Sequence, residues 1–273
     1  MRGCLKMELH RLFRTKSFWV ALVIGGCFVG SHILQVVLPY AQANRAVDNI
    51  RTNPMQFPFS ACMFFMGYDM YGWQGEILFR LMPLLTAIPF ANSYFCDISE
   101  GYIKNLQGKC RKEHYLIAKY MVTFLSGGLI MTLPLILDIL CCLALLPAHQ
   151  PVPIGVFGIS FSYSSMFYEH TIMFILMYLF VDFLIGGLYA VTVFLGTDFI
   201  ANKYLLVIFP YICVTIWQLV LPILQIPGLD PIQLSNPSAG SAEVINGFLL
   251  LLAWLSITFF VFFIRGKRRD EVV

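Results

Sequence analysis

A series of six long apolar runs, separated by polar connections, limits what this chain can fold into. Each run has about 20 residues or more, the length that an α-helix needs to cross the hydrocarbon core of a bilayer. The runs are Phe18–Leu38, Glu76–Cys96, Tyr115–Leu146, Thr171–Leu195, Tyr204–Ile226 and Val244–Ile264. With 59% hydrophobic and 12% charged residues, the chain is far more apolar than a soluble protein. The sequence therefore predicts an all-α polytopic membrane protein, with residues 1–273 forming one transmembrane domain.

The first and third runs need separate interpretation. Phe18–Leu38 follows a basic tail, as the apolar region of a signal peptide does, but its 21 residues exceed the roughly 7–15 residues of such a region. We therefore expect a retained first membrane helix. Tyr115–Leu146 has 32 residues, more than a bilayer requires, so we expect it to be tilted or to project into the cytoplasm at its start.

Lysine and arginine are distributed unevenly among the connections. With both termini inside, five lie in the N-terminal tail, five in Asp97–Lys119, one between the fourth and fifth runs and four in the C-terminal tail, so that 15 of the 18 face the cytoplasm. The outer connections hold only Arg45 and Arg51. Connections rich in Lys and Arg stay on the cytoplasmic side. The sequence therefore predicts cytoplasmic termini and a cytoplasmic position for Asp97–Lys119.

The polar stretch between the second and third runs lacks the patterns of two binding sites that its residues suggest. A phosphate-binding loop needs G-x-x-x-x-G-K-[ST], whereas six residues separate Gly101 from the Gly-Lys-Cys at 108–110, and Cys replaces the hydroxyl residue. A zinc site built from Cys96, Cys110 and His114 lacks a fourth ligand. We therefore expect this chain to bind neither a nucleotide nor a metal.

Motifs of known catalytic sites were sought and not found. The zinc-protease pattern H-E-x-x-H is absent, and the Ser, His and Asp residues form no nucleophile elbow. The sequence therefore predicts no catalytic residues and disfavours a membrane enzyme.

Three ionisable residues, Arg80, Asp138 and Asp182, fall within apolar runs. Charge in the bilayer core is costly, so we expect these side chains to face the bundle interior and to find partners. By depth, Arg80 and Asp138 are placed to pair with each other. Two roles stay open for the three residues: pins between helices, which their isolation favours, or a path for substrate or protons.

Several shorter segments leave two interpretations open. Met1–Lys16 forms either an amphipathic helix on the inner leaflet or a basic flank that only sets topology. The aromatic-rich connection Asn53–Gly75 either packs on the bundle or lies in the membrane interface, and residues 221–243 form a re-entrant turn or a plain outer loop. Small residues permit close helix contacts, and we expect internal packing rather than a dimer face at Gly26, Gly30, Gly127, Gly128, Gly186 and Gly187.

The run Leu81–Leu135 resembles the permease subunits of type-2 ABC exporters, the small six-helix permeases of bacterial lantibiotic immunity and drug efflux. In that family a proline-bearing second helix ends in an acidic residue and a Glu-Gly step, a basic cytoplasmic turn follows, and a Lys stands at the head of the third helix. The matching positions are Pro83, Pro89, Asp97, Glu100, Gly101, Lys104, Arg111, Tyr115 and Lys119. Thr197–Ile212 and the Asn236-Pro237 pair are also similar to the family.

The resemblance implies a six-helix permease fold with a cytoplasmic coupling segment, residues 97–114, that docks on a separate ATP-binding subunit. The docking residues that it implies are Asp97, Glu100, Gly101, Tyr102, Lys104, Lys109, Arg111 and Lys112. ATP and Mg would be bound by that partner ATPase and no cofactor by this chain. Two permeases, either two copies or this chain with a paralogue, would work with two ATPases.

The activity implied by the resemblance is export of an amphipathic antimicrobial peptide, drug or lipid across the plasma membrane of a bacterium, with a role in antibiotic resistance or peptide immunity. Membrane lipid is a further expected partner, and nucleic acid is not. Two alternatives stay open: a sensor or partner subunit of another membrane protein that transports nothing, and a polytopic membrane enzyme.

Overall fold

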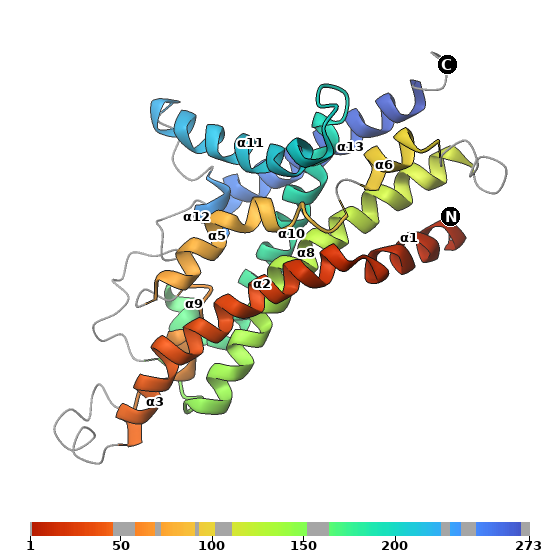
Figure 1. The fold of residues 1–273 in the computed structure, drawn as a ribbon. Helices are drawn as coiled ribbons and strands as arrows, with labels where there is room; N and C mark the ends of the chain where they lie inside the picture. Colours follow the sequence, from red (N-terminus) through yellow and green to blue (C-terminus); the bar gives the residue numbers. More distant parts are fainter. Residues whose placement is uncertain are drawn as a thin grey trace.

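The structure is a computed structural model, and it describes residues 2–45, 58–68, 72–90, 93–101, 111–151, 164–224, 230–235 and 244–268. Every regular element among these residues is a helix (Figure 1). The elements are α1 (Arg2–Arg14), α2 (Lys16–His32), the π-helix η1 (Ile33–Val37), α3 (Leu38–Arg45), the 3-10 helix η2 (Ala61–Phe64), α5 (Trp73–Leu85), α6 (Ser93–Ser99), α8 (Lys112–Leu145), α9 (Ser164–Glu169), α10 (Thr171–Gly196), α11 (Lys203–Leu224), α12 (Pro231–Ser235) and α13 (Val244–Arg268).

Within the described ranges, five helices are long and apolar enough to cross a membrane. They are the continuous helix Lys16–Arg45, which comprises α2, η1 and α3, and Lys112–Leu145, Thr171–Gly196, Lys203–Leu221 and Gly247–Arg268. These helices correspond to five of the six predicted runs. The protein is therefore an all-helical chain with the character of a multi-pass membrane protein.

The second predicted run is interrupted. The prediction of one continuous helix over Glu76–Cys96 is wrong, because α5 ends at Leu85 and α6 begins only at Ser93. At the break, Ala87 N–H donates to the carbonyl of Leu84 at 3.2 Å, a three-residue turn in place of an α-helical one. Pro89 then supplies no N–H and disfavours helical geometry in the residue before it. Proline therefore ends the α-helical ladder of α5.

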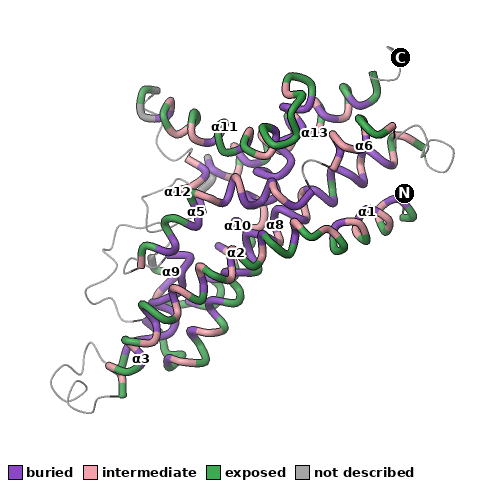
Figure 2. The backbone as a smooth tube through the Cα atoms, in the orientation of Figure 1, coloured by how far each residue is buried: buried purple, intermediate pink, exposed green. Residues whose placement is uncertain are grey.

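Helices α8 and α10 form the centre of the bundle, because their glycines bring the two backbones together. A Cβ added to Gly127 would lie 2.3 Å from the carbonyl oxygen of Gly186, and one added to Gly187 would lie 2.6 Å from the ring of Phe124. The predicted internal packing of these glycines is thus confirmed. Figure 2 shows α10 mainly buried, whereas α11 is largely exposed.

The other glycine motif behaves differently. No described atom lies within 4 Å of a Cβ built on Gly26 or Gly30, so the predicted internal packing of this pair is wrong. Gly25 is the residue that packs, since its Cβ would lie 2.6 Å from Cγ of Pro134 on α8. The contact between α2 and α8 therefore uses the neighbouring face of α2.

Three elements meet at one end of the bundle, which we call the basal end. Lys267, near the end of α13, pairs with Glu113, near the start of α8, at 2.5 Å. Glu8 of α1 pairs with Lys119 of α8 at 3.0 Å. Both described chain ends therefore lie at the same end of the bundle (Figure 1). We call the opposite end the distal end.

At the distal end, residues 58–68 pack into the bundle. Phe64, Phe65, Met66 and Tyr68 are each 1% exposed or less. Ala61 N–H donates to the carbonyl of Pro147 at 3.0 Å, which fixes the segment beside the end of α8. Of the two interpretations of the connection Asn53–Gly75, its described part therefore favours packing on the bundle.

The connection before α13 also carries a buried element. Pro231, Leu234 and Ser235 of α12 are buried, and α12 packs against α5, α10 and α13. A Cβ added to Gly247 of α13 would lie 2.2 Å from the side chain of Leu234. Within residues 221–243, α12 is thus packed in the fold rather than extended as a plain loop.

Candidate functional site

The N-terminal helix α1 is amphipathic and docks on α8. Its buried residues, Cys4, Glu8 and Leu12, recur every four positions, so they share one helical face. Arg2, Lys6 and Arg14 lie on the exposed face. The amphipathic helix predicted within Met1–Lys16 is thus present over Arg2–Arg14, while its place on the inner leaflet stays a prediction, and a carboxylate lies in the middle of the face that it buries.

That carboxylate belongs to a group of four charged side chains and one tyrosine that we call the basal cluster: Glu8, Arg11, Asp97, Tyr115 and Lys119. Arg11 donates to Asp97 from both terminal guanidinium nitrogens, Nη2 at 2.7 Å and Nη1 at 3.2 Å. Lys119 Nζ donates to Asp97 at 2.6 Å and to Glu8 at 3.0 Å. Tyr115 Oη donates to Asp97 at 2.5 Å, and Arg11 also donates to Glu8 at 3.0 Å. The cluster joins α1, α6 and α8.

The basal cluster is electrically balanced, because two carboxylates face two cations. Glu8, Asp97 and Lys119 are at most 2% exposed, and Arg11 is partly exposed at 34%. Burial raises the pKa of Asp97, but the hydrogen bond from Arg11 and the charge of Lys119 outweigh it and hold the pKa below its ordinary value. Asp97 is therefore ionised at neutral pH, and breaking the cluster would leave buried charge unpaired.

The basal cluster lies directly beside the predicted docking segment. Asp97 is enclosed by the cluster, whereas Glu100 and Arg111 are exposed, and Lys112 is half-buried. Gly101 has a φ of 66°, a left-handed conformation that favours glycine.

The predicted docking residues Tyr102, Lys104 and Lys109 lie outside the described residues. Glu8, which sequence reasoning missed, is the one acidic residue in the basic segment 1–16. The available signal was its spacing: Glu8 lies four residues from both Cys4 and Leu12, which places an isolated acid on the apolar face of the helix. Lys119 had been assigned to the head of the third helix, without a partner.

A second buried cluster lies toward the distal end, around Asp138. His32 Nδ1 and Asp138 Oδ1 are 2.7 Å apart, and both side chains are fully buried. Met66 N–H donates to the other carboxylate oxygen at 2.7 Å, so this cluster holds segment 58–68 against α8. The predicted pairing of Arg80 with Asp138 is wrong, because Arg80 pairs with Glu76 at 2.6 Å on an exposed helix face. His32, an ionisable residue in the first run, was missed by sequence reasoning.

Cys142 completes this second cluster. Its Sγ lies 3.9 Å from Asp138 Oδ2 and 3.4 Å from the carbonyl oxygen of Phe64. The ligand-type atoms of His32, Asp138 and Cys142 lie within 4.8 Å of one another, and a zinc ion accepts these donor types. In the structure, hydrogen bonds from this cluster instead join α2, α8 and segment 58–68. The cluster thus fits the role of a pin, one of the two roles predicted for Asp138.

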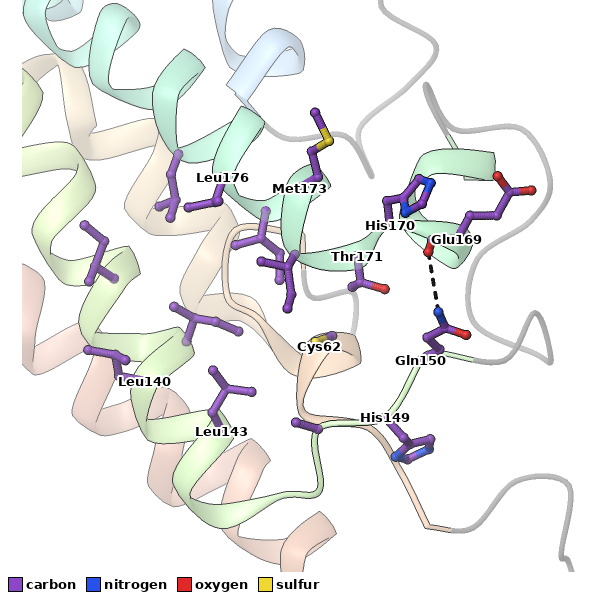
Figure 3. Close-up of a pocket in the computed structure, with 16 residues that line it drawn as sticks. Cys62, Leu140, Leu143, His149, Gln150, Glu169, His170, Thr171, Met173 and Leu176 are labelled. Atoms are coloured by element: carbon purple, nitrogen blue, oxygen red, sulfur yellow. Dashed lines mark hydrogen bonds between the residues drawn. The ribbon is translucent and has the colours of Figure 1, made fainter.

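A cleft of about 790 Å³ opens between α8 and α10 at the distal end (Figure 3). Its lining is largely aliphatic, with Leu140 and Leu143 contributed by α8 and Met173 and Leu176 by α10. Its mouth is polar and carries His149, Gln150, Glu169 and His170. Gln150 Nε2 donates to the carbonyl of Glu169 at 3.4 Å across the mouth. The cleft therefore suits a molecule that has an apolar body.

Asp182 of α10 differs from Asp138, because neither of its carboxylate oxygens has a hydrogen-bond partner among the described residues. The same holds for the hydroxyl of Tyr189, two turns along α10. Both residues are 1% exposed. Buried polar groups in proteins are nearly always paired, so this pair of side chains marks a place where a partner is expected.

Comparison with known proteins adds no family to this geometry. No family model matches the chain, and no curated protein matches it.

Proposed function

We propose that this chain is the membrane permease subunit of an ATP-driven exporter and that a separate ATP-binding subunit docks on residues 97–114. One observation carries the proposal: the basal cluster clamps both sides of that segment. Asp97 stands where the chain enters the segment, and Tyr115 and Lys119 stand where it leaves. The resemblance of Leu81–Leu135 to type-2 ABC exporter permeases adds the identity of the partner.

The path of the chain supports six crossings, although five helices are long enough to cross alone. Gln74, near the start of α5, donates to Gln35 at 2.9 Å, and Asp97 at the end of α6 binds Arg11. The chain through α5 and α6 therefore runs back along the first long helix, from beside Gln35 to beside α1. Along α2 this path is about 30 Å, the thickness of a bilayer core. Six crossings place both chain ends on one side, which the positive-inside rule makes the cytoplasm.

The basal cluster suits the transmission of force. When the ATPases close on ATP, they would push on the turn that holds Glu100 and Gly101. Because Asp97 is bound by Arg11 and Lys119, that push would reach α1, α6 and α8 together rather than bend the turn alone. Close contact of α8 with α10 then carries the motion into the centre of the bundle, where an amphipathic cargo would cross.

The test is co-purification of the permease with the ATPase encoded beside it, together with stimulation of ATP hydrolysis. We expect Glu100→Lys to reduce both by at least about tenfold, because a like-charge contact in an interface costs several kcal/mol. The matched control is Glu169→Lys, an equally exposed change at the distal end, which should leave both unchanged. Undiminished binding and stimulation for Glu100→Lys would remove the docking proposal.

A further inference from the structure

The cleft between α8 and α10 is lined by residues of the first turns of α10, on the distal side of Asp182. The two helices touch at Gly127 and Gly186, where there is no room for a Cβ atom, and they diverge toward Leu140 and Leu176 at the distal end. Asp182 precedes Gly186 by four residues, one helical turn on the same face. Asp182 itself is three residues beyond Leu179, the last residue of α10 that lines the cleft.

The lining of the cleft leads along α10 to that carboxylate. Ile175 and Leu179 line the cleft. Asp182 lies seven residues after Ile175 and three after Leu179, so all three share one face of the helix. Asp182 lies 11 residues from the start of α10, about 16 Å along the axis. This depth is near the middle of a bilayer core. A molecule that enters between the helices from the distal end approaches Asp182 along apolar walls.

The polar groups near this point are acidic or uncharged. Asp230, beside α12, accepts two hydrogen bonds from Gln218 at 3.2 and 3.3 Å, and α12 packs against α10. No cation in the described part of the chain pairs with Asp182, although the basal cluster gives each of its carboxylates two. An ionised carboxylate that stays unpaired in an apolar interior is very costly, and either protonation or a bound cation removes that cost.

We propose that the cleft and Asp182 together form a binding site for an aliphatic ammonium compound, with the chain in the cleft and the cation on Asp182. Tyr189 supplies a second oxygen on the same face of α10. Calling this molecule cargo rests on the proposed export function, but binding itself is measured on this chain alone.

The probe is a fluorescent single-chain alkyl ammonium, compared with an uncharged alkyl amide that carries the same chain and dye. Binding is measured to the full-length protein in nanodiscs of zwitterionic lipid, with empty nanodiscs subtracted. We expect the ammonium to bind at least about tenfold more tightly than the amide, as a charged hydrogen-bonded pair provides. Asp182→Asn should abolish this preference, and Asp182→Glu should keep it.

Two further variants separate the cleft from the membrane surface in general. Leu140→Trp fills the cleft and should weaken binding of both probes, whereas Leu252→Trp, on an exposed face of α13, should change neither. Equal affinity for ammonium and amide, a charge preference that survives Asp182→Asn, or unchanged binding to Leu140→Trp would each overturn the proposal. Charge-selective binding without ATPase docking would keep this site and reject the proposed function.

Discussion

Two regions of the molecule bury carboxylates in opposite ways. In the basal cluster, Asp97 and Glu8 share Arg11 and Lys119, so every charge has a partner within about one hydrogen-bond length. In the middle of α10, Asp182 is buried as deeply, but it has no hydrogen-bond partner among the described residues. Complete pairing produces a rigid joint between helices. Incomplete pairing leaves a polar group that the described residues do not satisfy.

The largest effect is expected for Lys119, the cation at the centre of the basal cluster. Lys119→Met should lower the free energy of unfolding by about 3–5 kcal/mol, because it leaves two buried carboxylates with only Arg11. The matched control is Lys267→Met, which removes an exposed pair with Glu113 and should cost at most about 1 kcal/mol. Thermal and denaturant unfolding of the purified protein measure both. Equal losses of unfolding free energy for the two variants would show that the basal cluster does not hold α1, α6 and α8 together.

A smaller effect is expected from acid. The pKa of Asp97 is lower in the folded protein than its ordinary value, so its contribution is present above about pH 4 and is lost as pH falls through the lower folded pKa. At neutral pH, Asp97→Asn should cost about 1.5–3 kcal/mol. The difference between wild type and variant should shrink below pH 4. A difference that stays constant from pH 7 to pH 3 would contradict the ionised state of Asp97.

The smallest effect is expected at Asp182. Asp182→Asn removes no described hydrogen bond, so the free energy of unfolding should change by less than about 1 kcal/mol, or rise. Unfolding in the absence of any added alkyl ammonium measures this change directly. A loss comparable to that of Lys119→Met would give Asp182 a partner within the protein and end the contrast between the two regions.

The long apolar runs predicted most of the membrane helices, because hydropathy is a property of each segment alone. The interruption of the second run depended on Pro89, whose position the sequence displayed but whose effect competed with strong hydropathy. The left-handed conformation of Gly101 is also a local matter, because glycine adopts it without a steric cost. Asp138 was correctly expected to be partnered, but the partner is His32 rather than Arg80. To choose between His32 and Arg80 as the partner of Asp138, one must know which side of each helix faces α8.

The sequence by itself determined the helical class, the membrane character and the clustering of basic residues, because apolar length and charge placement act through the solvent and need no tertiary contact. Only the tertiary structure decided that Asp97 is enclosed by Arg11 and Lys119, and that Asp182 is buried without a hydrogen-bond partner among the described residues. The physical reason is desolvation: what a buried charge costs depends on the groups that folding brings to it from distant parts of the chain.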